Sequence, residues 1–250
     1  MASRTKEGLL GVCTNRRNSP DRPDAEAPAS RLVSWALLAC AGWTDAVGFV
    51  MFSGLFVSFM SGDTTQLGVD LAHGNLQHVA KFAAPPALFV LGAAIGRLVV
   101  HWTGDKGRAA VLIIVAILLA FAAGRGLVSI DGVTLAAAVL AMGILNSAMH
   151  EANGVPVGTM ITGALVRLGE SLADLALRRP SKAVDNAGQW LAFLIAVFFG
   201  TLAFSFAGPR ALAVPAMGCA ALALAAARAR GLQAWGGSPS QSYKTDGDAR

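Results

Sequence analysis

The chain has 250 residues, of which 54% are hydrophobic and only 14% are charged, and its mean hydropathy is +0.56. Soluble domains carry charge on about a quarter of their residues, so this composition excludes an ordinary soluble enzyme or binding domain. The net charge of +5 comes mostly from the two ends of the chain and gives no support to a nucleic-acid partner. We therefore expect an integral membrane protein whose main partner is the lipid bilayer.

Both ends of the sequence are polar and differ sharply from the middle. Residues 1–31 are rich in Pro, Asp, Arg and Ser, with no apolar run after the first charges. This composition is typical of a disordered tail, whereas a signal peptide places an apolar run directly after its positive start. Residues 228–250 have the same character. Basic flanks beside apolar spans indicate the cytoplasmic side, so we expect both tails in the cytoplasm and a transmembrane domain at 32–227.

The region between the tails contains a series of apolar segments. A transmembrane helix needs about 20 mainly apolar residues. The second and the sixth segment are each interrupted in the middle by polar residues, so the order of one clean span, one broken span and two clean spans occurs twice. The segments expected to be helical are 32–52, 55–72, 82–100, 109–123, 133–148, 155–177, 190–207 and 211–227.

The first two segments recur in the second half of the chain at a constant spacing. Gly42 aligns with Gly143, and Asp45 aligns with Asn146. The alignment continues without a gap through the broken segments, where Met60-Ser61-Gly62 matches Ile161-Thr162-Gly163 and Gln66-Leu67-Gly68 matches Arg167-Leu168-Gly169. We expect an all-α polytopic transmembrane helical bundle built from two structural repeats, 32–123 and 133–227. Broken helices at equivalent places in two repeats indicate the binding site in many transporters.

The number of full crossings depends on whether the broken segments cross the membrane completely. If they do, the chain has eight spans and its halves are parallel. If they enter and return, the chain has six full spans plus two discontinuous helices, and three spans per half make the repeats inverted. The basic residues of the loops do not distinguish these topologies. We favour six full spans, because polar runs in the middle of a span are costly in lipid.

Asp45 lies near the middle of the first apolar segment. An ionisable group at that depth costs roughly 2.5–3.5 kcal/mol on insertion scales, and such groups usually have a function. One interpretation is a site for a cation or a proton, and the other is a structural carboxylate that bonds to a neighbouring helix. Its counterpart Asn146 has a similar shape without the charge, which favours a hydrogen-bonding role shared by both halves.

The broken segments supply the other candidate ligand-binding residues. Ser61-Gly62 and Thr162-Gly163 each place a hydroxyl before a residue without a Cβ, so the hydroxyl is expected to cap the half-helix that follows. Two such helix N-termini facing each other would present N–H groups and positive dipole ends to a solute. In the alternative, the glycines only pack against neighbouring helices and the hydroxyls bond back to the carbonyl four residues earlier. The remaining candidates are Asp63, Thr64, Thr65, Gln66 and Arg167.

Other groups of polar residues are weak evidence for chemistry. Asp63 places a carboxylate in the first turn of the expected half-helix, which argues against an anion as the ligand. Arg167 is expected to pair with Glu170 on one helix face. Asp70 and His73 are spaced as two metal ligands but lack a third, and no catalytic triad, phosphate loop or zinc-protease spacing occurs. We therefore predict no enzyme activity, no metal site and no cofactor.

Two blocks of sequence carry a resemblance to a known family. The first runs from Gly42-Trp43-Thr44-Asp45-Ala46 to Thr64, and the second runs from Gly154-Val155-Pro156-Val157 to Glu170. Over about residues 32–227 the chain resembles the YoaK-like family of uncharacterised bacterial membrane proteins, which is known as domain of unknown function 1275. Ser61-Gly62-Asp63 stands where that family has Thr-Gly-Asn, which makes the site more acidic. The resemblance implies a polytopic protein of the bacterial inner membrane and no particular activity.

We predict a small transporter or permease that moves a small solute or an ion through a polar site between the two broken helices. The alternative is a non-transporting membrane scaffold or sensor subunit, in which the paired motifs only pack the halves together. Gly92 and Gly96 form a Gly-x-x-x-Gly pair. Such a pair packs helices within one chain or joins copies in a homo-oligomer, and the first use is the commoner one.

Overall fold

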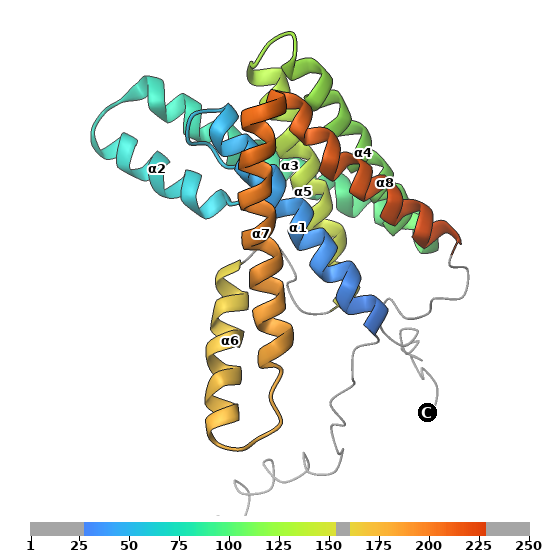
Figure 1. Ribbon diagram of the computed structural model, residues 1–250. Coiled ribbons are helices and arrows are strands. Elements are labelled where there is room, and N and C mark those ends of the chain that lie inside the picture. The colour runs from blue at the N-terminus through green and yellow to red at the C-terminus, as the bar shows by residue number, and fades with distance from the viewer. Residues whose placement is uncertain (1–27, 154–160, 229–250) are drawn as a thin grey trace, which may run out of the picture.

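The computed structural model of the protein describes residues 28–153 and 161–228, and all regular structure in these ranges is helical (Figure 1). The predicted all-α class is therefore confirmed. The predicted tails lie largely outside the described residues, although the first helix begins at Pro28, inside the segment assigned to the first tail. The helices are α1 (Pro28–Met51), α2 (Met60–Ala72), α3 (Leu76–Thr103), α4 (Gly107–Gly126), α5 (Gly132–Asn153), α6 (Ile161–Ala176), α7 (Ala183–Ala207) and α8 (Ala213–Arg228), with short 3₁₀ turns η1 (Gly104–Lys106) and η2 (Gly208–Leu212).

Four stretches are long and apolar enough to cross a membrane by length and composition: Leu32–Met51, Leu76–Thr103, Gly107–Gly126 and Ala183–Arg228. The last contains both α7 and α8, which meet at η2 and run in different directions in Figure 1. α5 adds the shorter apolar stretch Gly132–Ser147. These helices form a transmembrane bundle, and the count of six full spans stays a prediction.

The helices of the bundle pack in pairs that join the two halves of the chain. α1 packs along α7, α3 packs along α5, and α4 lies against both α5 and α8. The first long helix of each half is thus paired with a later helix of the other half. Each half therefore buries its apolar helices by packing on the other half.

Glycines allow close approach where α1 crosses α7. A Cβ on Gly42 would lie 2.8 Å from the carbonyl oxygen of Phe193, and a Cβ on Gly200 would lie 3.0 Å from that of Trp43. Backbone is the obstacle in both cases, and it does not move aside as a flexible side chain does. Small residues at such crossings let helices gain packing contacts where lipid supplies no hydrophobic force.

The crossing of α3 and α5 has the same construction. A Cβ on Gly96 would lie 2.7 Å from the carbonyl oxygen of Ile144, and a Cβ on Gly143 would collide with that of Phe89. Gly92 also faces α5, because its Cβ would lie 2.6 Å from the carbonyl oxygen of Leu140. The Gly92–Gly96 pair therefore packs helices within the chain, which is the first of the two alternatives for this motif.

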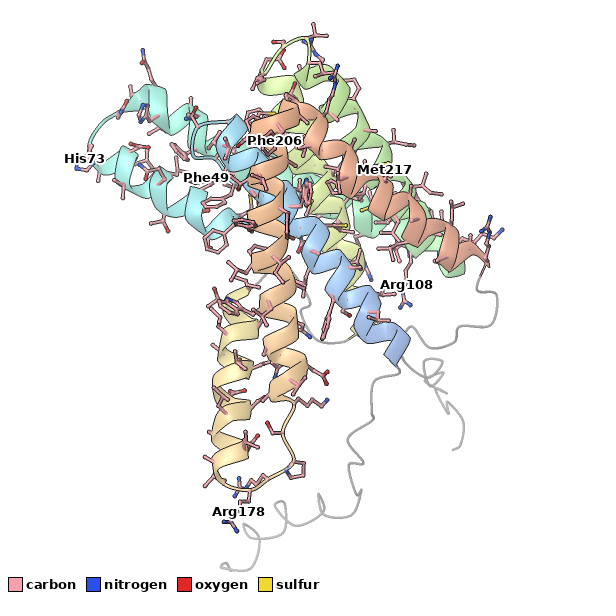
Figure 2. All side chains as sticks on the ribbon, in the orientation of Figure 1. Phe49, His73, Arg108, Arg178, Phe206 and Met217 are labelled. Atoms are coloured by element: carbon pink, nitrogen blue, oxygen red, sulfur yellow. The ribbon has the colours of Figure 1, made fainter. Side chains whose placement is uncertain are left out.

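Two helical arms extend from the bundle. The first arm consists of α2 and the amino-terminal part of α3, and the second arm consists of α6 and the amino-terminal part of α7. Figure 2 labels His73 at the tip of the first arm and Arg178 at the tip of the second. α2 has 13 residues and α6 has 16, fewer than a full crossing needs. Whether the broken segments cross the membrane completely stays a prediction.

The break in the first arm differs from the predicted one. We expected helix on both sides of Ser61-Gly62, but residues 55–59 are not helical and α2 begins at Met60. Phe59 is the N-cap residue of α2 and makes no side-chain cap hydrogen bond. The prediction that Ser61 caps this helix was therefore wrong. For α6 the residues before Ile161 lie outside the described part of the chain.

Candidate functional site

Asp45 binds the loop that joins α1 to α2, residues 52–59, which we call the α1–α2 loop. Its Oδ1 accepts the N–H groups of Val57 (3.0 Å) and Ser58 (2.7 Å), and its Oδ2 accepts the hydroxyl of Ser58. The loop comes this close because Gly48 has no side chain, since a Cβ there would lie 2.8 Å from Cγ1 of Val57. Asp45 is 4% exposed and has a donor on each oxygen.

Asp63 binds the same loop from the other side of the break. Its side chain projects from the first turns of α2, and its Oδ1 accepts the N–H of Phe56 at 3.2 Å. Asp63 is only 1% exposed, and its Oδ2 is buried with no hydrogen-bond partner among the described residues. A buried polar atom without a partner is uncommon in native structures and requires an explanation.

Asp45 and Asp63, which we call the carboxylate pair, hold three consecutive amides of the α1–α2 loop. Asp45 is close enough to act electrostatically on Asp63. The loop turns sharply at Ser53 and Gly54, whose φ angles are 52° and 94°. The two side chains therefore accept the hydrogen bonds of loop amides that are not part of a helix.

Aromatic rings cover the α1–α2 loop. Phe49 packs on Phe56 with ring centroids 4.8 Å apart, and Phe56 packs on Phe59 at 5.3 Å. Figure 2 labels Phe49 where α1 approaches α2. A Cβ on Gly62 would lie 2.9 Å from the Phe59 ring and 3.2 Å from the Phe56 ring. Gly62 thus acts as a packing glycine, as the alternative interpretation of this motif proposed.

The other polar candidates of α2 bond within their own helix. The hydroxyl of Thr64 donates to the carbonyl of Met60 at 2.7 Å, and that of Thr65 donates to the carbonyl of Ser61 at 2.8 Å. Gln66 donates to Oδ2 of Asp70 at 3.3 Å. The side chains of Ser61, Thr64, Thr65 and Gln66 are all exposed. The back-bonded alternative holds for the two threonines, and the structure does not gather these side chains around Asp63.

The candidate residues of the second half lie in different environments and do not form one site. Asn146 is half-buried in α5 and donates to the carbonyl of Met142 at 2.9 Å. Thr162 is exposed and Gly163 is half-buried in the first turn of α6. Arg167 donates from Nη2 to Oε1 of Gln189 on α7 at 3.3 Å. Its hydrogen-bond partner is therefore on the neighbouring helix, whereas the predicted partner, Glu170, is on its own helix. α2 and α6 are not among the helix pairs that pack closely on each other.

Each arm contains a buried polar anchor that the sequence interpretation did not assign. In the first arm Asp70 is 6% exposed and faces His78, with 3.6 Å between Oδ1 and Nδ1. In the second arm Asn186 donates to the hydroxyl of Ser171 at 2.7 Å and to the carbonyl of Arg167 at 3.2 Å. Asp70 and Ser171 align with each other at the constant spacing of the two sequence halves. That match was the available signal for both anchors.

One cavity of the bundle is apolar, and the described residues contain no metal cluster. A cavity of about 480 Å³ lies between α4 and α8, and its walls are apolar side chains such as Ile117, Ala120 and Met217. No group of three or more His, Cys, Asp or Glu side chains gathers at one point in 28–153 and 161–228. Among the described candidates, the carboxylate pair is the place where charge is concentrated inside the protein.

Comparison with known proteins gives the family. The family described as "Protein of unknown function (DUF1275)" matches residues 33–225. This chain belongs to the DUF1275 family. A relative from Rhizobium meliloti (strain 1021), named "UPF0700 transmembrane protein RA0705", is 35% identical over 194 residues, covering 77% of this chain and 83% of that protein. No solved structure matches the chain significantly.

Membership of the DUF1275 family confirms the resemblance drawn from the two sequence blocks. The matched range begins inside α1 and ends inside α8, so it includes the carboxylate pair and both arms. The name of the relative and the apolar helices together identify a membrane protein of unknown function.

Proposed function

We propose that this DUF1275 protein is a transporter or permease of the bacterial inner membrane that carries an ion or a small solute, with the carboxylate pair as part of its binding site. The observation that carries this proposal is Asp63, whose Oδ2 is buried and unpartnered beside a second buried carboxylate. Two buried negative charges with too few donors are costly unless a positive charge joins them. A site built in this way favours a cation or a proton over an anion.

The matched crossings support an origin of the fold from two repeats. The Cα of Gly42 faces the backbone of Phe193, and the Cα of Gly143 faces that of Phe89 in the same way. A second matching pair of contacts joins Gly200 to the backbone of Trp43 and Gly96 to that of Ile144. In Figure 1, α2 lies in the upper half of the molecule and α6 lies in the lower half. Inverted repeats with three full spans each would place the two arms toward opposite faces of the membrane. Alternating access by movement of one repeat against the other is the usual mechanism of such folds.

The carboxylate pair couples ligand charge to the shape of the α1–α2 loop. Both carboxylates accept hydrogen bonds from loop amides, and Asp63 does so through Oδ1 alone. A positive charge at Oδ2 would reduce the repulsion between the two groups and would favour the compact loop seen here. A ligand shifts a conformational equilibrium by its difference in affinity for the two states. The compact loop is therefore the state that the occupied site favours.

The test is transport by the full-length protein in proteoliposomes. Currents on a solid-supported membrane are recorded while gradients of protons, Na⁺, K⁺ and mixtures of small polar solutes are imposed. We expect a response above protein-free liposomes for at least one gradient, and loss of that response in Asp45→Asn and in Gly62→Leu. Glu170→Gln, an exposed carboxyl, and Gly68→Leu, which has open space around its Cβ, serve as matched controls.

Two outcomes would remove the transport proposal. One is a wild-type protein that stays silent under every imposed gradient. The other is a response that survives both Asp45→Asn and Gly62→Leu at the wild-type rate. Retention of both variants in the membrane fraction and in a monodisperse detergent peak separates loss of transport from loss of folding.

A second candidate function is a non-transporting membrane scaffold or sensor subunit. The complete set of donors around Asp45 and the back-bonded hydroxyls of Thr64 and Thr65 favour it, because these groups need no ligand. It predicts tolerance of polar changes at the carboxylate pair and sensitivity to bulky residues at Gly92 and Gly96. The same set of variants therefore distinguishes the two functions.

A further inference from the structure

We propose that Asp63 is a proton-binding residue, whose buried Oδ2 carries a proton in the state seen here while Asp45 remains ionised. The further claim that this proton is the coupling ion rests on the transport function proposed above. Binding of the proton itself is independent of transport and can be measured without it.

The donors around each carboxylate divide the two roles. Asp45 accepts from two amides and one hydroxyl, which is the environment that stabilises a carboxylate anion. Asp63 accepts from one amide on Oδ1 and from nothing on Oδ2 among the described residues. A buried ionised oxygen without a donor is far less favourable than a buried neutral hydroxyl. When two carboxylates share a site and differ in this way, the poorly solvated one takes the proton.

The charged groups on the neighbouring elements do not replace the proton. α1 contributes Asp45, whose negative charge repels that of Asp63. α3, which packs along α2, contributes His78 and Lys81. His78 lies against Asp70, and Lys81 donates to the carbonyl of Ser53 at 3.2 Å. Both cationic side chains therefore interact with groups other than Asp63.

The surroundings of Oδ2 fit a proton better than a metal ion. Hard cations such as Ca²⁺ take about six to eight oxygen ligands. Within the described residues the other side-chain oxygens of the carboxylate pair are already engaged by loop donors. The Phe56 and Phe59 rings cover the first turn of α2, which limits the water that could complete a coordination shell.

The repeat shows that the arm does not need this carboxylate for its shape. The position that matches Asp63 in the second half is Ala164, which is 2% exposed at the same turn of α6. A small apolar side chain therefore suffices for a buried position there. The step itself is a simple equilibrium, in which Oδ2 gains H⁺ from water and the pair changes from two negative charges to one.

The test is infrared difference spectroscopy on the full chain reconstituted in lipid. We expect a C=O stretching band of a protonated carboxyl that persists at a pH where exposed carboxyls are ionised and that disappears at alkaline pH. Its shift in D₂O identifies an exchangeable proton in the wild-type protein without any variant. Asp63→Asn should lose the band, because its Oδ1 still accepts from Phe56 while its Nδ2 cannot hold a carboxylic proton. Glu170→Gln should keep the band.

Each outcome is decisive for Asp63. A band that remains in folded Asp63→Asn, or that is lost in Asp45→Asn but not in Asp63→Asn, would overturn the assignment. Replacement of the band by Na⁺ or K⁺ at constant pH would show a metal-cation site instead. If the band behaves as expected but no proton-driven current appears, the proton site stands and the transport function fails. Should Asp63→Asn not fold, Asp45→Asn decides, because a band that persists in it supports the assignment to Asp63 and a band that disappears overturns it.

Discussion

The two halves of the chain align in sequence but differ in charge. The first half buries three carboxylates, and each has an uncharged counterpart at the matching position of the second half. Helices of the same kind form in both halves, so the architecture of an arm does not require these charges. The matching pairs are Asp45 and Asn146, Asp63 and Ala164, and Asp70 and Ser171.

The comparison teaches which polar residues hold the structure and which are available for function. Asn186 and Ser171 anchor the second arm with neutral hydrogen bonds that are fully made. The first arm is anchored by Asp70, and the carboxylate pair adds charge at the break before α2. Charge inside a membrane protein is costly and usually functional. The first half is therefore the place to look for ligand binding, and the second half is its structural control.

The largest expected effect tests the part of the comparison in which the halves are alike. Gly96→Leu and Gly200→Leu should both abolish the folded protein, because each new side chain meets a backbone carbonyl on the facing helix. Core overpacking typically costs about 1–3 kcal/mol, and a rigid obstacle raises that cost. The measurement is thermal stability in detergent by size-exclusion chromatography. Gly68→Leu should retain the wild-type profile, and equal tolerance of all three changes would refute the paired crossings.

A smaller effect tests the difference between Asp45 and Asn146. Asp45→Ala leaves the Val57 and Ser58 amides buried without their acceptor. Each unsatisfied buried group costs about 1–3 kcal/mol, so we expect a clear loss of stability. Asn146→Ala should cost less, because its donor bonds to a carbonyl of its own helix. Denaturant unfolding of both variants compares them, and a greater loss for Asn146→Ala would reverse the assignment.

The membrane class and the helical fold could be predicted from the sequence because they depend on local pattern. Apolar runs of the right length predict spans, and Gly62 marks the place where α2 meets the Phe56 and Phe59 rings. The family resemblance also depended on motifs along the chain and was confirmed. These features need no knowledge of which helix packs on which.

The partners of the polar residues could not be predicted, because they depend on contacts between distant segments. Ser61 was expected to cap α2, but the loop amides before that helix bond to Asp45 and Asp63 instead. Arg167 was expected to pair with Glu170, three residues later on the same helix, but it donates to Gln189 on α7 instead. A hydroxyl or a guanidinium has several local partners within reach, and tertiary packing decides among them.

The smallest expected effect compares the buried aspartates with the half-buried Asp131. Asp131 precedes α5, where its Oδ1 accepts the N–H groups of Val133 and Thr134 at 3.1 Å and its Oδ2 lies 2.7 Å from Nη2 of Arg125. The hydrogen bond from Thr134 is the main cause that lowers the pKa of Asp131 below its ordinary value of 3.8, with Ser129 and Arg125 adding to it. Because the folded state prefers the ionised form, this contribution is present at neutral pH and is lost as the pH falls through the lowered pKa.

Asp131→Asn isolates that charge, since an asparagine keeps the acceptor for both amides and loses only the ionised oxygen facing Arg125. We expect the variant to be slightly less stable than the wild type at neutral pH, and the difference to shrink when the pH falls below the ordinary range of an aspartate. Thermal melts of both proteins across an acidic pH series measure it. A difference that stays constant with pH would mean that Asp131 acts through its shape and not through its charge. The half-buried Asp131 would then provide no example of a partly solvated charge for comparison with the carboxylate pair.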